Sequence, residues 1–326
     1  MQARVTLHQL RILRVVAEEG SIAGAARRLH LTSPTLSIQL GQLADALGLP
    51  LHQVSGRRLR LTEAGMDTLE AARHIDAELR LLDQRLAARR GIERGRLQIA
   101  AVSTAEYLLP ALLGQFRKFH PGIEASLAIL PRIALLDRLA DDLDDAYLMT
   151  RPPPADDLAV EPVGLNPLVM IAAPSHPWAD DPAIDFEAAA SARFVVREPG
   201  SGTRLWTADW LARFGAELRP ALELGSNEAI KQAVMAGYGL AVISLHAVRL
   251  EIDTGRLVLL RVPHFPAPMR WYLVRRRSSA ISPAAQAFRS HLIEHMPERD
   301  RRMRQLLAQR GLCFDEADAV NASRED

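Results

Sequence analysis

The chain of 326 residues is 48% hydrophobic and 24% charged, an ordinary globular composition that predicts two or three domains and excludes a disordered or fibrous chain. Its net charge of +1 excludes a uniformly basic or acidic polypeptide, and it contains no uninterrupted run of 18 apolar residues that could span a membrane. The first 20 residues carry scattered charges instead of an apolar signal core, and the single Cys313 excludes an internal disulfide, so we expect a cytoplasmic protein.

The charge is unevenly distributed along the chain. Residues 1–62 contain eight arginines, against only Glu18, Glu19 and Asp45. This excess of positive charge predicts an anionic partner for the amino-terminal segment alone.

Residues 7–20 have the pattern of a core-building helix, and residues 21–47 that of two short helices joined by a turn. Thr32 or Ser33 can cap the second short helix, and Pro34 occupies its first position, where a missing N–H is harmless. Four leucines recur in this helix at spacings of four and three, on one stripe that we expect to face the core: Leu36, Leu40, Leu43 and Leu47.

The face opposite this stripe carries small side chains that could enter a DNA major groove, about 12 Å wide. We therefore predict a helix–turn–helix whose base-contacting residues are Ser33, Pro34, Thr35, Ser37 and Ile38. The alternative is a plain helical hairpin in an all-α core.

Residues 48–61 have the pattern of a β-hairpin, with Gly56 at the tip and alternating leucines after it. We expect this wing to reach DNA phosphates or the adjacent minor groove through three arginines: Arg57, Arg58 and Arg60. A solvated basic turn is the alternative.

Thr62 opens a long predicted helix, Glu63 to about Arg90, roughly 40 Å in length. Apolar residues form a seam along it: Ala72, Ile75, Leu79, Leu82 and Leu86. Such a seam requires a partner helix, and a homodimer would place two recognition helices on one duplex, with half-sites roughly 34 Å apart. Packing within one chain is the alternative.

Residues 91–95 form a linker, after which strands alternate with helices, the pattern of a doubly wound α/β domain with a mostly parallel sheet. A first unit has expected strands at 97–102, 123–130 and 146–149 and helices at 105–119 and 133–143. A second unit starts near Leu165, with expected strands at 169–172, 194–197 and 222–224 and helices at 203–214 and 227–236. A strand at 271–275 and a helix at 284–296 are expected to return to the first unit, and a charged segment follows from Pro297.

These patterns predict four parts of the chain. They are a winged helix–turn–helix domain (1–62), a linker helix (63–90), a domain of two α/β lobes (91–300) and a tail (301–326). The lobes are expected at 91–163 plus 268–300 and at 164–267.

Three polar turns follow predicted strands, at the position where open α/β sheets bind ligands: Ser103-Thr104, Gly200-Ser201-Gly202-Thr203 and Ser226-Asn227. Helix N-termini suit carboxylate or phosphate, so the three turns together predict an anion-binding cleft between two lobes. Each turn alone can be an ordinary helix cap, and Ser103 with Glu106 also fits a capping box. Candidate counter-charges, any of which could instead be a solvated surface residue, are Arg132, Arg151, Arg197, Arg204 and Lys231.

Residues 7–65 closely resemble the DNA-binding domain of LysR-type transcriptional regulators, at Leu7-His8-Gln9-Leu10-Arg11, at the turn before Pro34, and at Leu59-Arg60-Leu61-Thr62-Glu63-Ala64-Gly65. The resemblance extends to about residue 296. Within the family, four segments resemble the Calvin-cycle operon regulators of the CbbR group in particular: residues 102–105, 151–154, 196–204 and 225–231.

This resemblance implies a two-lobed effector domain like that of periplasmic binding proteins, and an activator of carbon-fixation genes that senses a phosphorylated metabolite. By the same resemblance, the cleft-lining positions would be Ser103, Thr104, Arg132, Thr203, Ser226, Asn227 and Lys231. The polar turns and the candidate counter-charges add Ser201 and Arg151 to the predicted effector residues. The implied partners are double-stranded promoter DNA, a small anionic effector and further copies of the chain, as a dimer of dimers, with RNA polymerase left open. Neither a cofactor nor a metal is expected. The sequence departs from the group at Ser33, where the family often has Gln, and at Pro131 and Thr150.

Two rival functions remain: a LysR-type regulator that answers an aromatic or amino acid, and a two-lobed solute-binding protein of the transport type. Catalysis is not expected, because Gly200-x-Gly202 lacks the third glycine of a dinucleotide fingerprint, and the chain contains neither a Gly-Lys-Ser/Thr phosphate loop nor a His-Glu-x-x-His metal pair.

Overall fold

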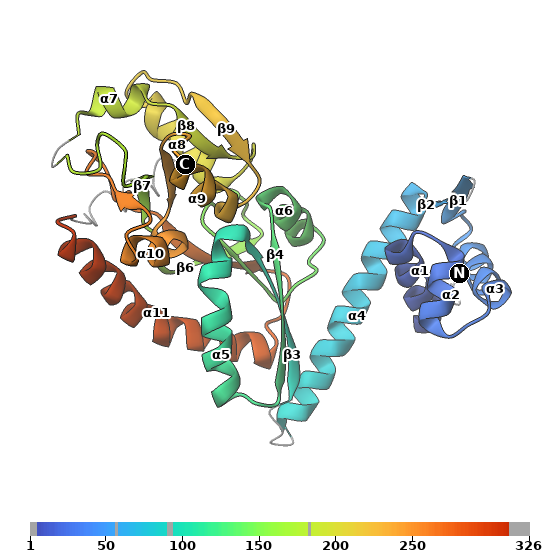
Figure 1. Cartoon of the computed structure of the whole chain (residues 1–326). Helices are drawn as coiled ribbons and strands as arrows, with labels where there is room; N and C mark the ends of the chain where they lie inside the picture. Colours follow the sequence, from blue (N-terminus) through green and yellow to red (C-terminus); the bar gives the residue numbers. More distant parts are fainter. Residues whose placement is uncertain (1–4, 56–57, 90–93, 182–183, 313–326) are drawn as a thin grey trace. The chain divides into compact units, whose positions relative to one another are not determined.

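The computed structural model describes residues 5–55, 58–89, 94–181 and 184–312, and the chain forms two compact units, residues 1–86 and 87–326 (Figure 1). The first unit contains three helices, a hairpin and a long helix: α1 (Leu7–Glu19), α2 (Ile22–Leu29), α3 (Ser33–Leu47), β1 (His52–Ser55), β2 (Arg58–Leu61) and α4 (Glu63–Arg89, whose last turn lies past residue 86). The predicted helix–turn–helix and hairpin are therefore present at the expected positions.

The ends of α3 show why the helix forms there. The Thr32 hydroxyl accepts a hydrogen bond from the backbone N–H of Thr35 at 3.3 Å, and Pro34 lies in the first turn. Leu36, Leu40 and Leu43 are fully buried, as predicted, but Leu47 is 37% exposed. The prediction of a core position for Leu47 was wrong, because the helix ends at Gly48 beyond the edge of the core.

Hydrogen bonds and one close backbone contact position the hairpin and the start of α4. The Leu59 N–H donates to the Gly20 carbonyl at 3.2 Å, and the Thr62 hydroxyl caps α4 by accepting from the Gly65 N–H at 3.0 Å. A Cβ at Gly65 would lie 1.9 Å from the carbonyl oxygen of Leu51. Glycine is therefore required where α4 begins, because α4 passes directly over the chain that enters the hairpin.

The second unit consists of two α/β lobes. The sheet of lobe 1 has the strand order β4-β3-β5-β12-β6: β3 (Gly95–Val102), β4 (Ile123–Leu130), β5 (Ala146–Met149), β6 (Leu158–Leu165) and β12 (Arg270–Arg276). The sheets of lobe 2 have the orders β10-β7-β11 and β8-β9: β7 (Leu168–Ala172), β8 (Phe194–Arg197), β9 (Pro220–Leu224), β10 (Ala241–Ser244) and β11 (Val258–Leu259). A bridge between Phe194 and Leu240 joins β8 to β10.

The strand directions reveal the same design in each lobe. In lobe 1 only β12 runs opposite to the other strands, and in lobe 2 only β7 does. Each of these strands is the first one that the chain enters after crossing between lobes, at residues 165–168 and 259–270. The mostly parallel α/β arrangement predicted from the sequence is confirmed.

Helices cover both faces of the lobe 1 sheet (Figure 1). The helical elements of the second unit are η1 (Ser103–Tyr107, a 3-10 turn), α5 (Leu109–Phe119), α6 (Arg132–Ala140), α7 (Phe186–Ser191), α8 (Gly202–Ala212), α9 (Asn227–Met235), α10 (Leu245–Asp253) and α11 (Pro283–Gln309). Helices α5 and α11 pack on one face around Phe116 and Phe288, and α6 packs on the other around Tyr147.

The last helix differs most from its prediction. It continues through Pro297 to Gln309, thirteen residues beyond the expected end at Met296 and into the segment assigned to the tail. Met296 is buried in the core of lobe 1, whereas Met303 and Leu307 are buried in the core of lobe 2. Burial of these two side chains offsets the roughly 3 kcal/mol that an interior proline costs a helix, so α11 ties the lobes together.

None of the helices in the described part of the chain combines the length and the apolar character needed to span a membrane.

Gly65→Ala is expected to destabilise the first unit by about 1–3 kcal/mol, because its methyl group would overlap a backbone carbonyl that cannot rotate away. Hydrogen exchange over residues 33–65 should become faster. Gly41→Ala, within α3 and with open space around its Cβ, is the matched control and should slow exchange slightly. Equal exchange in the two variants would contradict the close approach.

Candidate functional site

A pocket of about 350 Å³, partly open to solvent, is lined by residues of both lobes. Its lining is Val102, Ser103, Thr104, Arg132, Met149, Thr150, Arg151, Arg197, Glu198, Ser201, Gly202 and Thr203. Six of the nine predicted effector residues are therefore brought together here: Ser103, Thr104, Arg132, Arg151, Ser201 and Thr203.

The topology explains why these residues meet. Strands β3, β5 and β8 end at the pocket, and η1 and α8 begin there, so free backbone N–H groups of a helix start are available to an anion. Gly200 adopts the left-handed conformation (φ 83°) that turns the chain from β8 into α8. A Cβ at Gly202 would lie 3.0 Å from the Thr150 hydroxyl, so a small residue lets the lobes approach.

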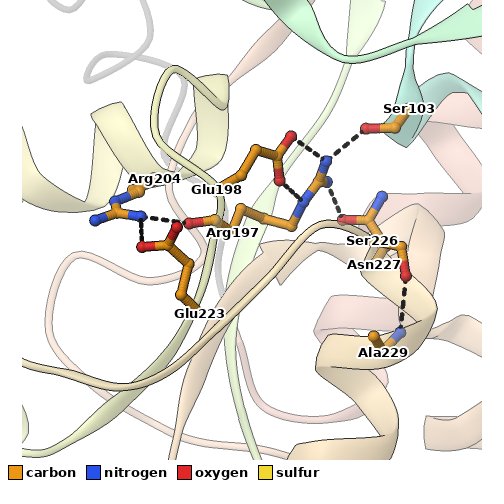
Figure 2. Close-up of polar contacts among 8 residues, drawn as sticks. All are labelled: Ser103, Arg197, Glu198, Arg204, Glu223, Ser226, Asn227 and Ala229. Atoms are coloured by element: carbon orange, nitrogen blue, oxygen red, sulfur yellow. Dashed lines mark hydrogen bonds and ion pairs between the residues drawn. The ribbon is translucent and has the colours of Figure 1, made fainter.

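Arg197 is the centre of the polar network in the pocket wall (Figure 2). Its Nε and Nη2 donate to the two carboxylate oxygens of Glu198 at 2.7 and 2.8 Å, and its Nη1 donates to Asn227 Oδ1 at 2.8 Å. Nη2 also donates to the Ser103 hydroxyl at 2.9 Å, which links lobe 2 to lobe 1. The Arg197 side chain is 4% exposed, so these bonds are largely shielded from water.

Arg132 and Arg151 add positive charge from lobe 1. Arg132 Nη2 donates to the Arg151 carbonyl at 2.9 Å, while its buried Nε has no hydrogen-bond partner among the described residues. Burial, and then the charge of Arg151, lower the pKa of Arg132 from its ordinary value. Arg151 forms an ion pair with Asp209 of α8 at 2.7 Å. No carboxylate of the described part of the chain pairs with Arg132, so the pocket carries uncompensated positive charge.

The remaining three predicted residues do not line this pocket. Asn227 is buried behind Arg197, and the Ser226 hydroxyl caps α9 by accepting from the Ala229 N–H at 3.1 Å. Lys231 forms ion pairs with two carboxylates, Glu228 at 2.7 Å and Glu251 at 2.8 Å. Ser226 and Lys231 therefore have structural partners of their own.

The sequence analysis missed two features of the site. The Ser103–Glu106 capping box is absent, because η1 has no side-chain cap and the Ser103 hydroxyl accepts from Arg197 instead. Glu198 was not predicted at the site at all. The available signal was Arg197 itself, a charged residue that ends an otherwise apolar buried strand.

The predicted DNA-contacting residues of α3 form one exposed surface: Ser33, Pro34, Thr35, Ser37 and Ile38. Ile38 is 58% exposed, so its side chain is accessible to a partner. In the wing, Arg60 is exposed, Arg58 is the first residue of β2, and Arg57 lies outside the described residues. These side chains can make the contacts of a groove-reading helix and a phosphate-contacting hairpin.

The predicted seam on α4 is mostly uncovered within the chain. Ala72 is buried against the helix–turn–helix core, whereas four larger residues are 38–51% exposed: Ile75, Leu79, Leu82 and Leu86.

Among the described residues no group of three or more His, Cys, Asp or Glu side chains could hold a metal ion.

A winged helix–turn–helix followed by a two-lobed domain with a polar cleft defines a class of ligand-responsive DNA-binding proteins. The chain matches the family model of the LysR substrate binding domain at residues 90–297 and that of the bacterial regulatory helix-turn-helix protein, lysR family, at residues 7–66. The chain therefore belongs to the LysR family of transcriptional regulators.

Relatives from the same family resemble most of the chain. It is 39% identical over 290 residues to the HTH-type transcriptional activator CmpR of Synechocystis, covering 89% of this chain and 95% of CmpR. It is 41% identical to a RuBisCO operon transcriptional regulator of Acidithiobacillus ferrooxidans, covering 88% and 93%. The CcmR regulatory domain of Synechocystis, solved in complex with 2-PG, is 38% identical with a TM-score of 0.60, covering 62% of this chain and 98% of that domain.

Arg197→Lys is expected to lower stability by about 1–3 kcal/mol, because lysine cannot reproduce the fixed fork that bonds Glu198, Asn227 and Ser103 at once. Denaturant unfolding of the whole chain measures this loss. Arg96→Lys, at a side chain 74% exposed, is the control and should change little. Equal midpoints for both variants would argue against a structural role of the network.

Proposed function

We propose that this protein regulates carbon-fixation genes and that its inter-lobe pocket binds a small phosphorylated acid as an effector, without catalysis. The observation that carries the proposal is the set of three guanidinium groups at the pocket, of which Arg132 has no carboxylate partner among the described residues. We also propose a cytoplasmic location, where such genes are read.

The chemistry of the lining favours a phosphate. Arginine forks match phosphate oxygens in geometry and charge, and the start of α8 offers backbone N–H groups on the same side. Hydroxyl groups come from both lobes: Ser103, Thr104 and Thr150 from lobe 1 and Ser201 and Thr203 from lobe 2. A dianion held by both sets would favour lobe closure.

The comparisons support the same ligand class. CcmR was solved with 2-PG, a phosphorylated metabolite, and relatives about 40% identical to this chain are named as RuBisCO operon regulators. We extend that role and that ligand chemistry to this chain.

The alternative effector, an aromatic or amino acid, is disfavoured by the lining. Apart from Gly202, only Val102 and Met149 of the twelve lining residues are apolar, which offers little surface to an aromatic ring. Isothermal titration of the whole chain with both ligand classes distinguishes the two.

The exposed seam of α4 supports pairing of two chains. Four half-exposed apolar residues on one long helix would be covered by the same helix of a second copy, which would put two recognition helices on one duplex. We propose a dimer of dimers in which cleft closure changes the spacing between pairs of DNA-binding domains, through a coupling of about 1–3 kcal/mol.

Arg132→Gln is expected to weaken 2-PG binding roughly 10- to 100-fold, because a hydrogen bond to a charged group contributes about 1.5–3 kcal/mol. Calorimetry on the whole chain provides the measurement, with Arg96→Gln, an exposed residue away from the pocket, as the control. An unchanged dissociation constant in Arg132→Gln would remove Arg132 from the proposed site.

Arg60→Ala is expected to weaken binding to every DNA sequence similarly and to reduce the slope of log K against log salt by about 0.9, the value for one lost phosphate contact. Ser37→Ala should instead change the ranking of DNA sequences, because its hydroxyl faces the expected groove. Salt-dependent titrations against a panel of duplexes measure both. A uniform loss for Ser37→Ala would place Ser37 outside the base-reading set.

A further inference from the structure

A second, separate pocket lies between helices α10 and α11, which run close together in Figure 1. It has a volume of about 420 Å³, partly open to solvent, and none of its lining residues belongs to the inter-lobe pocket. The lining consists of His246, Arg249, Arg299, Arg302, Met303 and Leu306. Three of these six residues are arginines and none is acidic, and the α11 residues lie beyond the part of the chain that matches the family model.

The arginines of this second pocket are not all neutralised. Arg249 forms an ion pair with Asp253 at 3.6 Å, and Arg302 with Glu298 at 2.9 Å. Arg299 of α11 is half-buried and has no hydrogen-bond or ion-pair partner among the described residues. Burial, and then the charge of Arg302, lower the pKa of Arg299 from its ordinary value. A half-buried cation without an anion is costly unless a ligand supplies one.

The imidazole of His246 lies in the wall of the same pocket. Its Nε2 lies 3.1 Å from the carbonyl oxygen of Leu165, which can only accept, so Nε2 carries a proton. Burial lowers the pKa of His246 to about 4, and the charges of Arg299 and Arg249 act in the same direction. The imidazole thus experiences the positive field of the pocket, which an anion would relieve.

We propose that the pocket of His246, Arg249, Arg299 and Arg302 is a second anion-binding site, specific for a phosphate group, either inorganic phosphate or the phosphate of a metabolite. Guanidinium groups from two helices converge on it, as they do in phosphate sites. The site is a concave pocket between two helices, which suits a free anion better than the backbone of a DNA duplex.

The position of this pocket connects it to the movement of the lobes. The Leu165 carbonyl bonded by His246 ends β6, where the chain crosses into lobe 2, and the Leu165 N–H donates to Asp300 Oδ1 of α11 at 3.0 Å. Arg299 lies on α11 between Met296 in the lobe 1 core and Met303 in the lobe 2 core. An anion that joins α10 to α11 would therefore restrain the crossing between lobes.

The test uses the whole chain with ring-labelled histidine, with the NMR signals of His246 assigned through His246→Gln. Inorganic phosphate and glycerol 3-phosphate are titrated separately at pH 7, in the wild type and in Arg132→Gln, which weakens the inter-lobe pocket. We expect saturable shifts of the His246 signals with at least one of the two ligands, unchanged by Arg132→Gln. The ligand that binds more tightly identifies the source of the phosphate.

Two substitutions in the second pocket complete the test. Arg299→Gln and Arg249→Gln should each weaken the His246 response at least tenfold, and Arg249, 61% exposed, can be changed with little risk to folding. Arg301→Gln is the matched control, because Arg301 lies on the same helix, is 70% exposed and does not line the pocket. Equal responses in Arg299→Gln and Arg301→Gln would overturn the proposal. So would the absence of any saturable shift, even if Arg299→Gln lowered DNA affinity.

Discussion

One buried cation, the guanidinium of Arg197, links the two lobes at the wall of the pocket. It makes a two-pronged bond to Glu198, a bond to Asn227 within lobe 2 and a bond to Ser103 of lobe 1. Because a buried guanidinium without partners is strongly unfavourable, these bonds must be kept or replaced whenever the lobes move. A phosphate that enters the pocket brings its own acceptors to Arg197 and its own negative charge against Glu198. The ligand would therefore alter the bond network that links the lobes at the pocket.

The net charge of the chain conceals three separate concentrations of arginine. The amino-terminal 62 residues carry an excess of positive charge where we expect DNA, and the inter-lobe pocket holds Arg132 without a carboxylate partner in the described structure. The third concentration lies between α10 and α11, beside the strand crossing. An acidic balance elsewhere brings the total to +1. The distribution, rather than the sum, is what identifies anionic partners.

Local patterns in the sequence predicted the parts of the fold that local interactions determine. Leu36, Leu40 and Leu43 face the core because their spacing matches a helix, and Thr32 caps α3 as its position indicates. The pairing of lobes was harder to predict, because Ser103 and Arg197 are 94 residues apart and nothing near Ser103 distinguishes a cap from a ligand. The helix through Pro297 was missed for a similar reason, since Met303 stabilises it by packing on distant residues. Lys231 was a plausible counter-charge until its contact with Glu251, on a helix further along the chain, became visible.

The central claim is that a phosphorylated acid in the inter-lobe pocket changes how the protein holds DNA. The bend angle of a promoter fragment bound by the whole chain, followed by fluorescence energy transfer between its ends, measures this directly. We expect the end-to-end distance to change saturably with 2-PG while the protein remains bound. A distance that stays constant as calorimetry shows the pocket becoming occupied would contradict the account.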